Sequence, residues 1–284
     1  STEFEGAKIS QEELISGCPG KDCIKSIDSP TFENIKSAKS WISEKDLVFV
    51  VQINGKKRAY PQKILNRHEI VNDVFEGKKI AVTFCPLCGS ATAFERSVNG
   101  TYTQFGVSGF LHNNDLIMYD RFEGNLWQQI TGTAIVGDAA KRNEVLKSIL
   151  IVGLEFGEWA KNNPDAEVLS RAVIGLDYNI YPYDDYEQNE EVLFPQNIDK
   201  TIHPKTPVYG ININKSSKAY REVDILNKKE IKDTIGGENI TINANESNEI
   251  SFKKDNDNVE LIPTRLFWFA FKAFNPDATV YTAE

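Results

Sequence analysis

Two parts of this chain resemble each other, and this internal similarity limits the folds that the chain can adopt. The matching pairs are residues 57–60 (KRAY) with 217–220 (SKAY), 64–70 (ILNRHEI) with 225–231 (ILNKKEI), and 163–168 (NPDAEV) with 275–280 (NPDATV). Similarity that recurs in the same order indicates a structural unit used twice. The sequence therefore predicts two degenerate copies of one αβ unit, the second much shortened, packed as a pseudo-twofold body.

The local pattern within each unit predicts a β-rich α+β fold. Residues 47–53 form an apolar run, Asn54-Gly55 is a strong hairpin signal, and residues 56–60 return as a second strand. Apolar residues at roughly helical spacing predict a short helix over residues 64–71. The remaining predictions are a strand at 80–84, a hairpin of 91–96 with 102–107, a strand at 116–120 and a helix at 156–162.

These patterns divide the chain into four segments. They are an N-terminal arm (1–46), a first repeat (47–169), a connector rich in Tyr and Pro (170–205) and a shortened second repeat (206–284). Connectors this long are usually functional or wrapped over a neighbouring surface. The connector tyrosines are expected either to pack the crossover against both halves or to line a groove.

Composition limits the partners. The net charge of −9 and the isoelectric point near 5.1 exclude a nucleic-acid phosphate backbone as an expected partner. No apolar run approaches the roughly 18–20 residues that span a bilayer. Hydrophobic residues make up 40% of the chain and charged residues 26%, which is typical of a soluble globular protein.

The Cys-Pro-Leu-Cys stretch at residues 85–88 is the main candidate for chemistry. It follows a predicted strand, and Pro86 and Gly89 favour a tight turn. A turn brings both sulfurs to one side, where they can bind one metal ion or form a disulfide. A zinc ribbon would need two such pairs, and this chain has one.

The second repeat serves as an internal control for this stretch. By sequence identity, Lys229 stands in the place of His68, and Asn245 and Asn248 stand in the places of Cys85 and Cys88. The fold unit therefore does not need the two thiols and the imidazole, which favours a chemical role for them in the first repeat.

The first hypothesis is a metal site of His68, Cys85 and Cys88, with His112 or Met118 as a further ligand. Thiolates and imidazoles are ligands for zinc and copper. Copper would permit redox or oxidase chemistry, whereas zinc would not. The hypothesis requires that the imidazole of His68 lie beside the two sulfurs.

Two other functions remain open. A Cys-x-x-Cys turn after a strand is also typical of thiol–disulfide oxidoreductases. Alternatively, the protein is a non-catalytic, glycosylated subunit of a cell surface or extracellular assembly, and self-associates or binds a surface partner. Asp115, Asp120 and Glu123 are interpreted as turn residues rather than as acid–base groups.

Several features favour an extracellular, cell-surface or periplasmic location. Cys18 and Cys23 are close enough in sequence to form a local disulfide, which requires an oxidising compartment. The chain begins at Ser1 rather than Met, for which a cleaved secretion signal is one explanation. The Asn-x-Ser/Thr sites are Asn99, Asn214, Asn239 and Asn245.

Taken together, several motifs resemble those of a family of secreted bacterial and archaeal proteins of unknown function. The motifs are residues 83–90 (TFCPLCGS), 59–61 (AYP), 68–73 (HEIVND), 105–109 (FGVSG), 116–121 (LIMYDR) and 275–277 (NPD). The resemblance implies an extracytoplasmic setting and a duplicated β-rich fold, and implies no activity. Cys18 and Cys23 stand where relatives usually have glycines, and His112 where they more often have an aromatic residue.

Overall fold

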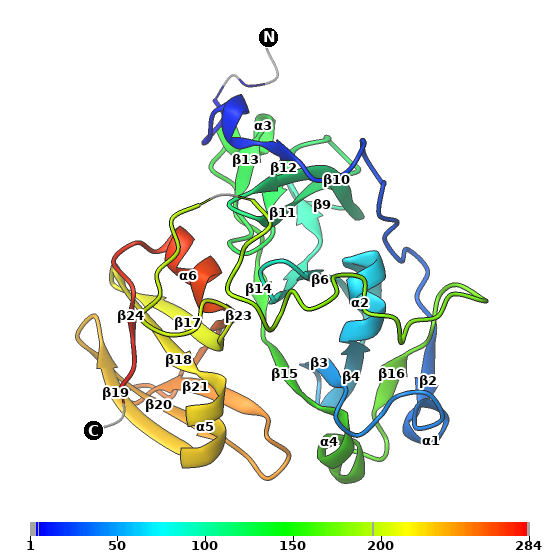
Figure 1. The fold of residues 1–284 in the computed structure, drawn as a ribbon, viewed down its shortest axis with the longest axis vertical. Coiled ribbons are helices and arrows are strands. Elements are labelled where there is room, and N and C mark those ends of the chain that lie inside the picture. The colour runs from blue at the N-terminus through cyan, green and yellow to red at the C-terminus, as the bar shows by residue number, and fades with distance from the viewer. Residues whose placement is uncertain (1–3, 5, 195, 283–284) are drawn as a thin grey trace.

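A computed structural model describes residues 4, 6–194 and 196–282 of the chain. Strands contain 41% of the residues and helices 14%, so the β-rich character predicted from the sequence is confirmed. The chain forms several sheets with short helices at their margins (Figure 1). None of the described helices has the length and hydropathy of a membrane-spanning segment.

The N-terminal part of the chain builds two sheets of its own. In the first, the chain returns through the Asn54-Gly55 turn, where both residues have positive φ values, as the hairpin signal predicts. Its strands, in spatial order, are β15 (Ile151–Glu155), β3 (Leu47–Ile53), β4 (Lys56–Pro61), β16 (Glu167–Leu169) and β2 (Phe32–Asn34). The second sheet contains β1 (Ile15–Ser16), β10 (Phe105–His112), β11 (Asp115–Asp120), β12 (Leu126–Gln128) and β13 (Ala134–Val136).

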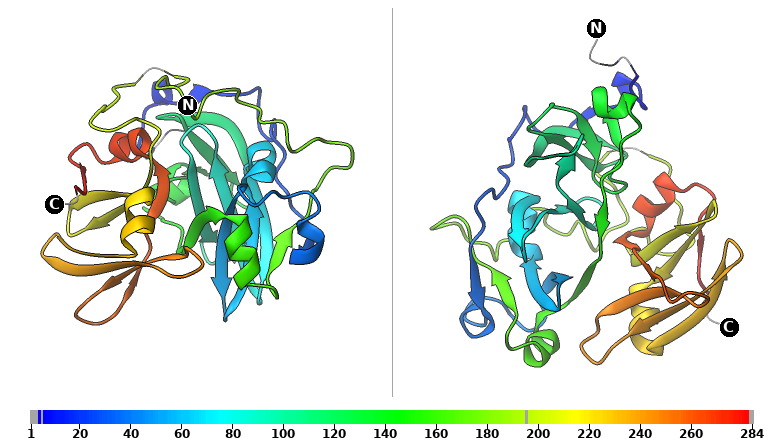
Figure 2. Two further views of the ribbon diagram at one scale, coloured as in Figure 1. Left: turned by 60° about the horizontal axis from the view of Figure 1, so that its bottom comes forward. Right: turned by 180° about the vertical axis from the view of Figure 1, so that it is seen from behind.

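A third sheet runs through both halves of the molecule. Strand β23 of the C-terminal half pairs with β7 of the N-terminal half, with Arg265 opposite Ala91. The two halves therefore lie side by side in one hydrogen-bonded structure (Figure 2, right). The strands, in order, are β24 (Thr279–Val280), β18 (Ser216–Arg221), β17 (Pro207–Ile213), β23 (Thr264–Phe267), β7 (Ser90–Glu95), β6 (Lys78–Cys85) and β5 (Ile70–Phe75), with β14 (Ser148–Ile149) also on β7.

The remaining elements are short. One further sheet contains β19 (Glu230–Ile235), β20 (Glu238–Ala244), β21 (Ile250–Lys254) and β22 (Glu260–Leu261), and β8 (Ser97–Val98) pairs only with β9 (Thr101–Tyr102). The helices are α1 (Ile35–Ala38), α2 (Gln62–His68), α3 (Asp138–Lys141), α4 (Phe156–Asn162), α5 (Glu222–Lys228) and α6 (Trp268–Phe274), with a 3₁₀ helix at Gln11–Glu13.

The two halves share an order of elements and a tyrosine–aspartate hydrogen bond. The order β3, β4, α2, β5, β6 has its counterpart in β17, β18, α5, β19, β20. The hydroxyl of Tyr60 donates to Asp73 at 2.7 Å, and that of Tyr220 donates to Asp233 at the same distance. In these strands each residue of the first half has its counterpart at the same position of the strand pairing in the second half.

The register at the end of the helices differs from the one inferred from sequence identity. The amide of Glu69 donates to Leu65 at 2.8 Å, and the amide of Lys229 donates to Ile225 at 2.9 Å. Both Glu69 and Lys229 have a left-handed backbone, with φ of 59° and 64°. The structural counterpart of Lys229 is therefore Glu69, and His68 corresponds to Lys228.

Two local predictions need correction. Helix α2 ends at His68, and residues 70–71 belong to strand β5, because the left-handed Glu69 ends the helix and β-branched Ile70 and Val71 favour a strand. The chain does turn at Asn99-Gly100, but the turn joins only the short strands β8 and β9, and β10 pairs with β11 instead of β7.

The N-terminal arm is part of the sheets. It supplies β1 to one sheet and β2 to another. The connector, residues 170–205, contains no helix or strand among its described residues and crosses from one half to the other. Both segments end up close to the turn at residues 85–88, which lies in the largest part of the apolar core.

Candidate metal centre

The Cys85–Cys88 turn joins strands β6 and β7. Cys85 is the last residue of β6, and the amide of Cys88 donates to its carbonyl at 3.2 Å. Gly89 has a φ of +57°, which glycine adopts without the steric cost of a side chain. A Cβ atom at Gly89 would lie 2.6 Å from the Phe267 ring. The turn therefore holds both thiols on the same side, and the Phe267 ring leaves no room for a side chain at position 89.

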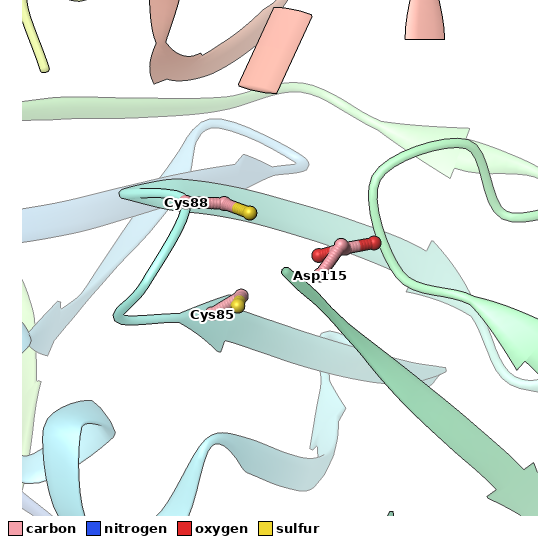
Figure 3. A group of neighbouring side chains, drawn as sticks. All are labelled: Cys85, Cys88 and Asp115. Atoms are coloured by element: carbon pink, nitrogen blue, oxygen red, sulfur yellow. The ribbon is translucent and has the colours of Figure 1, made fainter. Parts of the chain in front are cut away.

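A carboxylate from another sheet lies beside the two thiols. Asp115 begins β11, directly after the Asn113-Asn114 turn of the β10–β11 hairpin, in which both asparagines have positive φ values. One ligand atom from each of Cys85, Cys88 and Asp115 lies within 4.8 Å of the others (Figure 3). The two cysteines are at most 2% exposed and Asp115 is fully buried. The sulfurs also face the hairpin backbone, with Cys85 Sγ 3.5 Å from the Asn114 carbonyl oxygen.

The two oxygens of Asp115 differ in their surroundings. Oδ2 accepts hydrogen bonds from Gln128 Nε2 at 2.5 Å and from the amide of Ile130 at 3.0 Å. Oδ1 is buried and has no hydrogen-bond partner among the described residues. Burial raises the pKa of Asp115 to about 7, although these hydrogen bonds and the thiol of Cys85 act in the opposite direction. A buried carboxylate oxygen without a partner is costly unless a positive charge approaches it.

The surroundings of Cys88 also disfavour a bare negative charge. Burial raises the pKa of the Cys88 thiol well above its ordinary value, and the neighbouring Cys85 and Asp115 raise it further. This is opposite to the lowered thiol pKa of a redox nucleophile. The site as it stands therefore favours a neutral Cys88 thiol.

A second buried carboxylate belongs to the same neighbourhood. Glu69 is 7% exposed and follows α2 directly. Burial raises its pKa to about 8, and the charge of Asp115 adds to the effect. Neither Glu69 nor Asp115 takes part in an ion pair with any described residue.

The predicted histidine ligands do not join this group. His68 Nδ1 lies 2.8 Å from the carbonyl oxygen of Lys25, and Nε2 lies 2.8 Å from the hydroxyl of Tyr178. Both ring nitrogens therefore already have partners in the N-terminal arm and the connector. The predicted arrangement of His68 beside the sulfurs was wrong, because His68 is the last residue of α2 and the following residue, Glu69, is the one near Asp115.

His112 and Met118 are also outside the group. His112 pairs with Asp115 in the backbone register of β10 and β11, but its imidazole Nδ1 lies 2.7 Å from Gln128 Oε1, so the imidazole is linked to the Asp115 carboxylate through the amide of Gln128. Met118 is fully buried in the core, where it pairs with Val107 of β10 on one side and with Trp127 of β12 on the other. Of the predicted ligands, the structure brings together Cys85 and Cys88.

The other cysteines and the Asn-x-Ser/Thr sites are placed as follows. Cys18 and Cys23 form a disulfide with a Cα–Cα distance of 6.1 Å, whereas Cys85 and Cys88 are free. The four predicted glycosylation sites, Asn99, Asn214, Asn239 and Asn245, are all exposed.

The connector covers the turn. The Tyr186 hydroxyl donates to the Leu87 carbonyl at 2.8 Å. The side chain of Asn114 exchanges two hydrogen bonds with the backbone of Phe194, at 3.1 and 2.9 Å. Tyr183 is close enough to Glu69 and Cys85 that their charges add to the effect of burial in raising its pKa. Tyr183 and Tyr186 of the connector thus pack against the site.

Sequence reasoning missed Asp115 and Glu69. From the sequence, Asp115, which directly follows Asn113-Asn114, is interpreted as a turn residue. Its only distinguishing signal was its place at the start of an apolar run (116–119), which marks the boundary of a buried strand. The signal for Glu69 was the loss of the acid at the corresponding position of the second half, which the shifted alignment concealed.

The fold and the site define a β-rich protein with a buried cluster of two thiols and a carboxylate between its sheets. The chain belongs to the family described as "Protein of unknown function (DUF3179)", which matches residues 21–262. Searches among curated proteins and among solved structures found no match.

Proposed function

We propose that this protein binds a transition-metal ion, zinc in the first place, through Cys85, Cys88 and Asp115. The observation that supports this most directly is the convergence of three buried ligand atoms within 4.8 Å, together with the buried Oδ1 of Asp115, which has no hydrogen-bond partner among the described residues. They come from two different sheets, so no local turn requirement explains their meeting.

A bound cation would resolve the electrostatic problem of this site. Three acidic groups lie together away from water, and none forms an ion pair with a described residue. A divalent ion compensates such groups directly, and it also lowers the pKa of thiols that bind it. The same groups without an ion would be difficult to explain as packing.

The mixture of donors favours zinc over copper. Zinc accepts thiolate and carboxylate ligands together in tetrahedral geometry. Copper(I) prefers soft sulfur donors, and the imidazoles that would have supported a copper site lie elsewhere. Redox chemistry is therefore not part of the proposal, and copper in the isolated protein would be the result that restores it.

The proposed setting is extracytoplasmic. The Cys18–Cys23 disulfide is typical of oxidising compartments, and the exposed Asn-x-Ser/Thr sites are compatible with glycosylation. In such a compartment, metal binding would also explain why two neighbouring thiols remain unoxidised.

We infer further that the two halves are degenerate copies of one unit with pseudo-twofold symmetry. Support comes from the matching hydrogen bonds of Tyr60 and Tyr220 and from the two left-handed residues that end α2 and α5. In this interpretation only the first copy retains a metal site.

Elemental analysis of native protein isolated without chelator tests the proposed function. We expect near-stoichiometric zinc, and we expect Cys88→Ser and Asp115→Asn to lose it. Asn248→Ser, at the position in the second half that corresponds to Cys88, is the matched control and should retain zinc. A metal-free native protein with a Cys85–Cys88 disulfide would contradict the proposal and favour thiol–disulfide chemistry.

A further inference from the structure

The position of Glu69 is unusual for a glutamate. Its backbone is left-handed (φ +59°), a conformation that few residues other than glycine and asparagine adopt. Its side chain is buried, and no described donor forms a hydrogen bond with its carboxylate. The Glu69 carbonyl accepts the amide of Phe84 at 2.8 Å, which fixes Glu69 next to the end of β6, one residue before Cys85.

The second half shows where a side chain at this position points. Lys229 has the same backbone conformation and the same hydrogen bond, from the amide of Ala244 to its carbonyl at 2.9 Å. Its ammonium group donates to Asn248 Oδ1 at 2.7 Å. Asn248 corresponds to Cys88, and its amide closes the same turn onto the carbonyl of Asn245 at 3.0 Å.

The side chain of Lys229 thus points towards the turn, and Glu69 starts from the same backbone conformation, but the charges differ. In the second half a positive ammonium group faces neutral asparagines. In the first half an acidic side chain accompanies two thiols and Asp115. The first half therefore has no positive charge at the position where the second half has the ammonium group of Lys229.

We propose that Glu69 is the fourth ligand of the metal ion and completes a closed site of two sulfurs and two oxygens. This inference rests on the proposed function. The Glu69 carboxylate is not among the ligand atoms that lie within 4.8 Å of one another, so it would reach the ion by rotation about its three side-chain bonds. Four protein ligands are the pattern of a structural zinc site, whereas catalytic sites leave one position open.

A closed site would connect three separate elements. Glu69 lies at the corner between α2 and β5, the cysteines at the β6–β7 turn, and Asp115 on the β10–β11 hairpin. An ion bound by all of them would fix the sheet of β10 and β11 to the sheet that runs through both halves.

Cobalt substitution and zinc competition test the inference on the full chain. For Glu69→Gln we expect a zinc affinity lower by about 100-fold or more, and loss of the intense visible bands that tetrahedral cobalt(II) gives in the wild type. Lys229→Gln is the matched control and should keep the wild-type affinity and spectrum. A Glu69→Gln protein with wild-type affinity and spectrum would overturn the role of Glu69 but leave the proposed function intact.

A second variant covers the possibility that Glu69→Gln fails to fold. Glu69→Lys reproduces the second half, so we expect it to be folded in the presence of chelator, by circular dichroism, and to bind no zinc or cobalt. Zinc binding by Glu69→Lys at wild-type affinity would overturn the inference. Wild-type protein that binds neither zinc nor cobalt would overturn the proposed function together with it.

Discussion

We expect Asp115 to destabilise the folded protein when no metal ion is bound and to stabilise it when one is. Its pKa is raised to about 7 from an ordinary value of 3.8, so the folded protein holds this proton more tightly than the unfolded chain does. The stability that follows from this difference is complete below about pH 4 and is lost as the pH rises through 7. A bound cation would reverse the preference by favouring the ionised form.

Asp115→Asn should therefore have opposite effects on the two forms of the protein. In the presence of chelator at pH 8, we expect the variant to be more stable than the wild type by on the order of a few kcal/mol, because it lacks the buried charge. With saturating zinc, the wild type should be the more stable protein. Urea unfolding with and without zinc measures both, and a variant stabilised by zinc as strongly as the wild type would exclude Asp115 as a ligand.

Lys205 provides a pH-dependent test away from the metal centre. It is 3% exposed, its ammonium group donates to the carbonyl of Tyr186 and to Asn189 Oδ1, and it lies 3.4 Å from the centre of the Tyr186 ring. Burial lowers its pKa to about 8. Between about pH 8 and 10.5 the unfolded chain binds this proton and the folded protein does not, so folding becomes more favourable as the pH rises.

We expect Lys205→Met to remove this pH dependence. The urea midpoint of the wild type should rise relative to that of the variant between pH 8 and 10.5. The exposed Lys200, replaced by Met, is the control and should follow the wild type at every pH. Parallel curves for wild type and Lys205→Met would show that the lysine titrates normally in the folded protein.

At the scale of elements, the β6–β7 turn is the tightest point of the candidate site. Gly89 and Gly77 both have positive φ values, 57° and 76°, but a Cβ atom at Gly77 would meet nothing within 4 Å. Gly77→Ala should cost about 1 kcal/mol through its backbone conformation alone. Gly89→Ala should cost more than about 2 kcal/mol, because the methyl group also displaces the Phe267 ring.

Thermal and urea unfolding of the two alanine variants would measure this difference. Equal losses of stability would mean that the Phe267 ring moves aside at little cost, and that the turn is less constrained than its geometry indicates.

The elements that the sequence predicted well are those whose signals are local. The turns at Asn54-Gly55 and Asn99-Gly100, and the Cys85–Cys88 turn, depend on residues that favour positive φ or a fixed bend. The helix was predicted to extend too far because Ile70 and Val71 happen to continue the helical spacing of apolar residues. Spacing alone does not show that a left-handed residue ends the helix.

The candidate site could be predicted only in part for a different reason. The two cysteines meet through a turn, whereas Asp115 reaches them from another sheet, and pairing between sheets leaves no signal in the spacing of a single sequence. The choice of His68 followed from aligning Ile64 with Ile225 by identity. In the structure it is Leu65 that corresponds to Ile225, and this shift of one residue exchanges the histidine for Glu69.

At the scale of the whole molecule, one buried ion pair lies where the halves meet. The guanidinium of Arg265 on β23 bonds Glu222 of α5 at 2.6 and 3.1 Å, and Arg265 is 4% exposed. A Cβ atom on Gly153 of β15 would lie 2.6 Å from the Arg265 side chain, so the side chain crosses directly over the first half. This contact requires glycine at position 153.

Glu222→Gln should destabilise the protein by about 3–5 kcal/mol, because it leaves a buried guanidinium without its charge partner. Asp224→Asn removes the partner of the more exposed Arg221 on the same helix and should cost at most about 1 kcal/mol. Urea unfolding at neutral pH measures both losses. Similar small losses would mean that water reaches Arg265 and compensates its charge.

The amide of Phe267 donates to the carbonyl of Cys88 at 2.8 Å, so a peptide group of the C-terminal half closes directly onto the candidate metal turn. Its proton can exchange with solvent only when that hydrogen bond opens. Deuterium uptake at this single amide should therefore slow when zinc is added to chelator-treated protein, while the amide of Ala244 in strand β20 of the same half, which donates to the carbonyl of Lys229, should be unaffected. Deuterium uptake at the Phe267 amide would thus report how much of the protein has an ion bound, without any label attached to the cysteines.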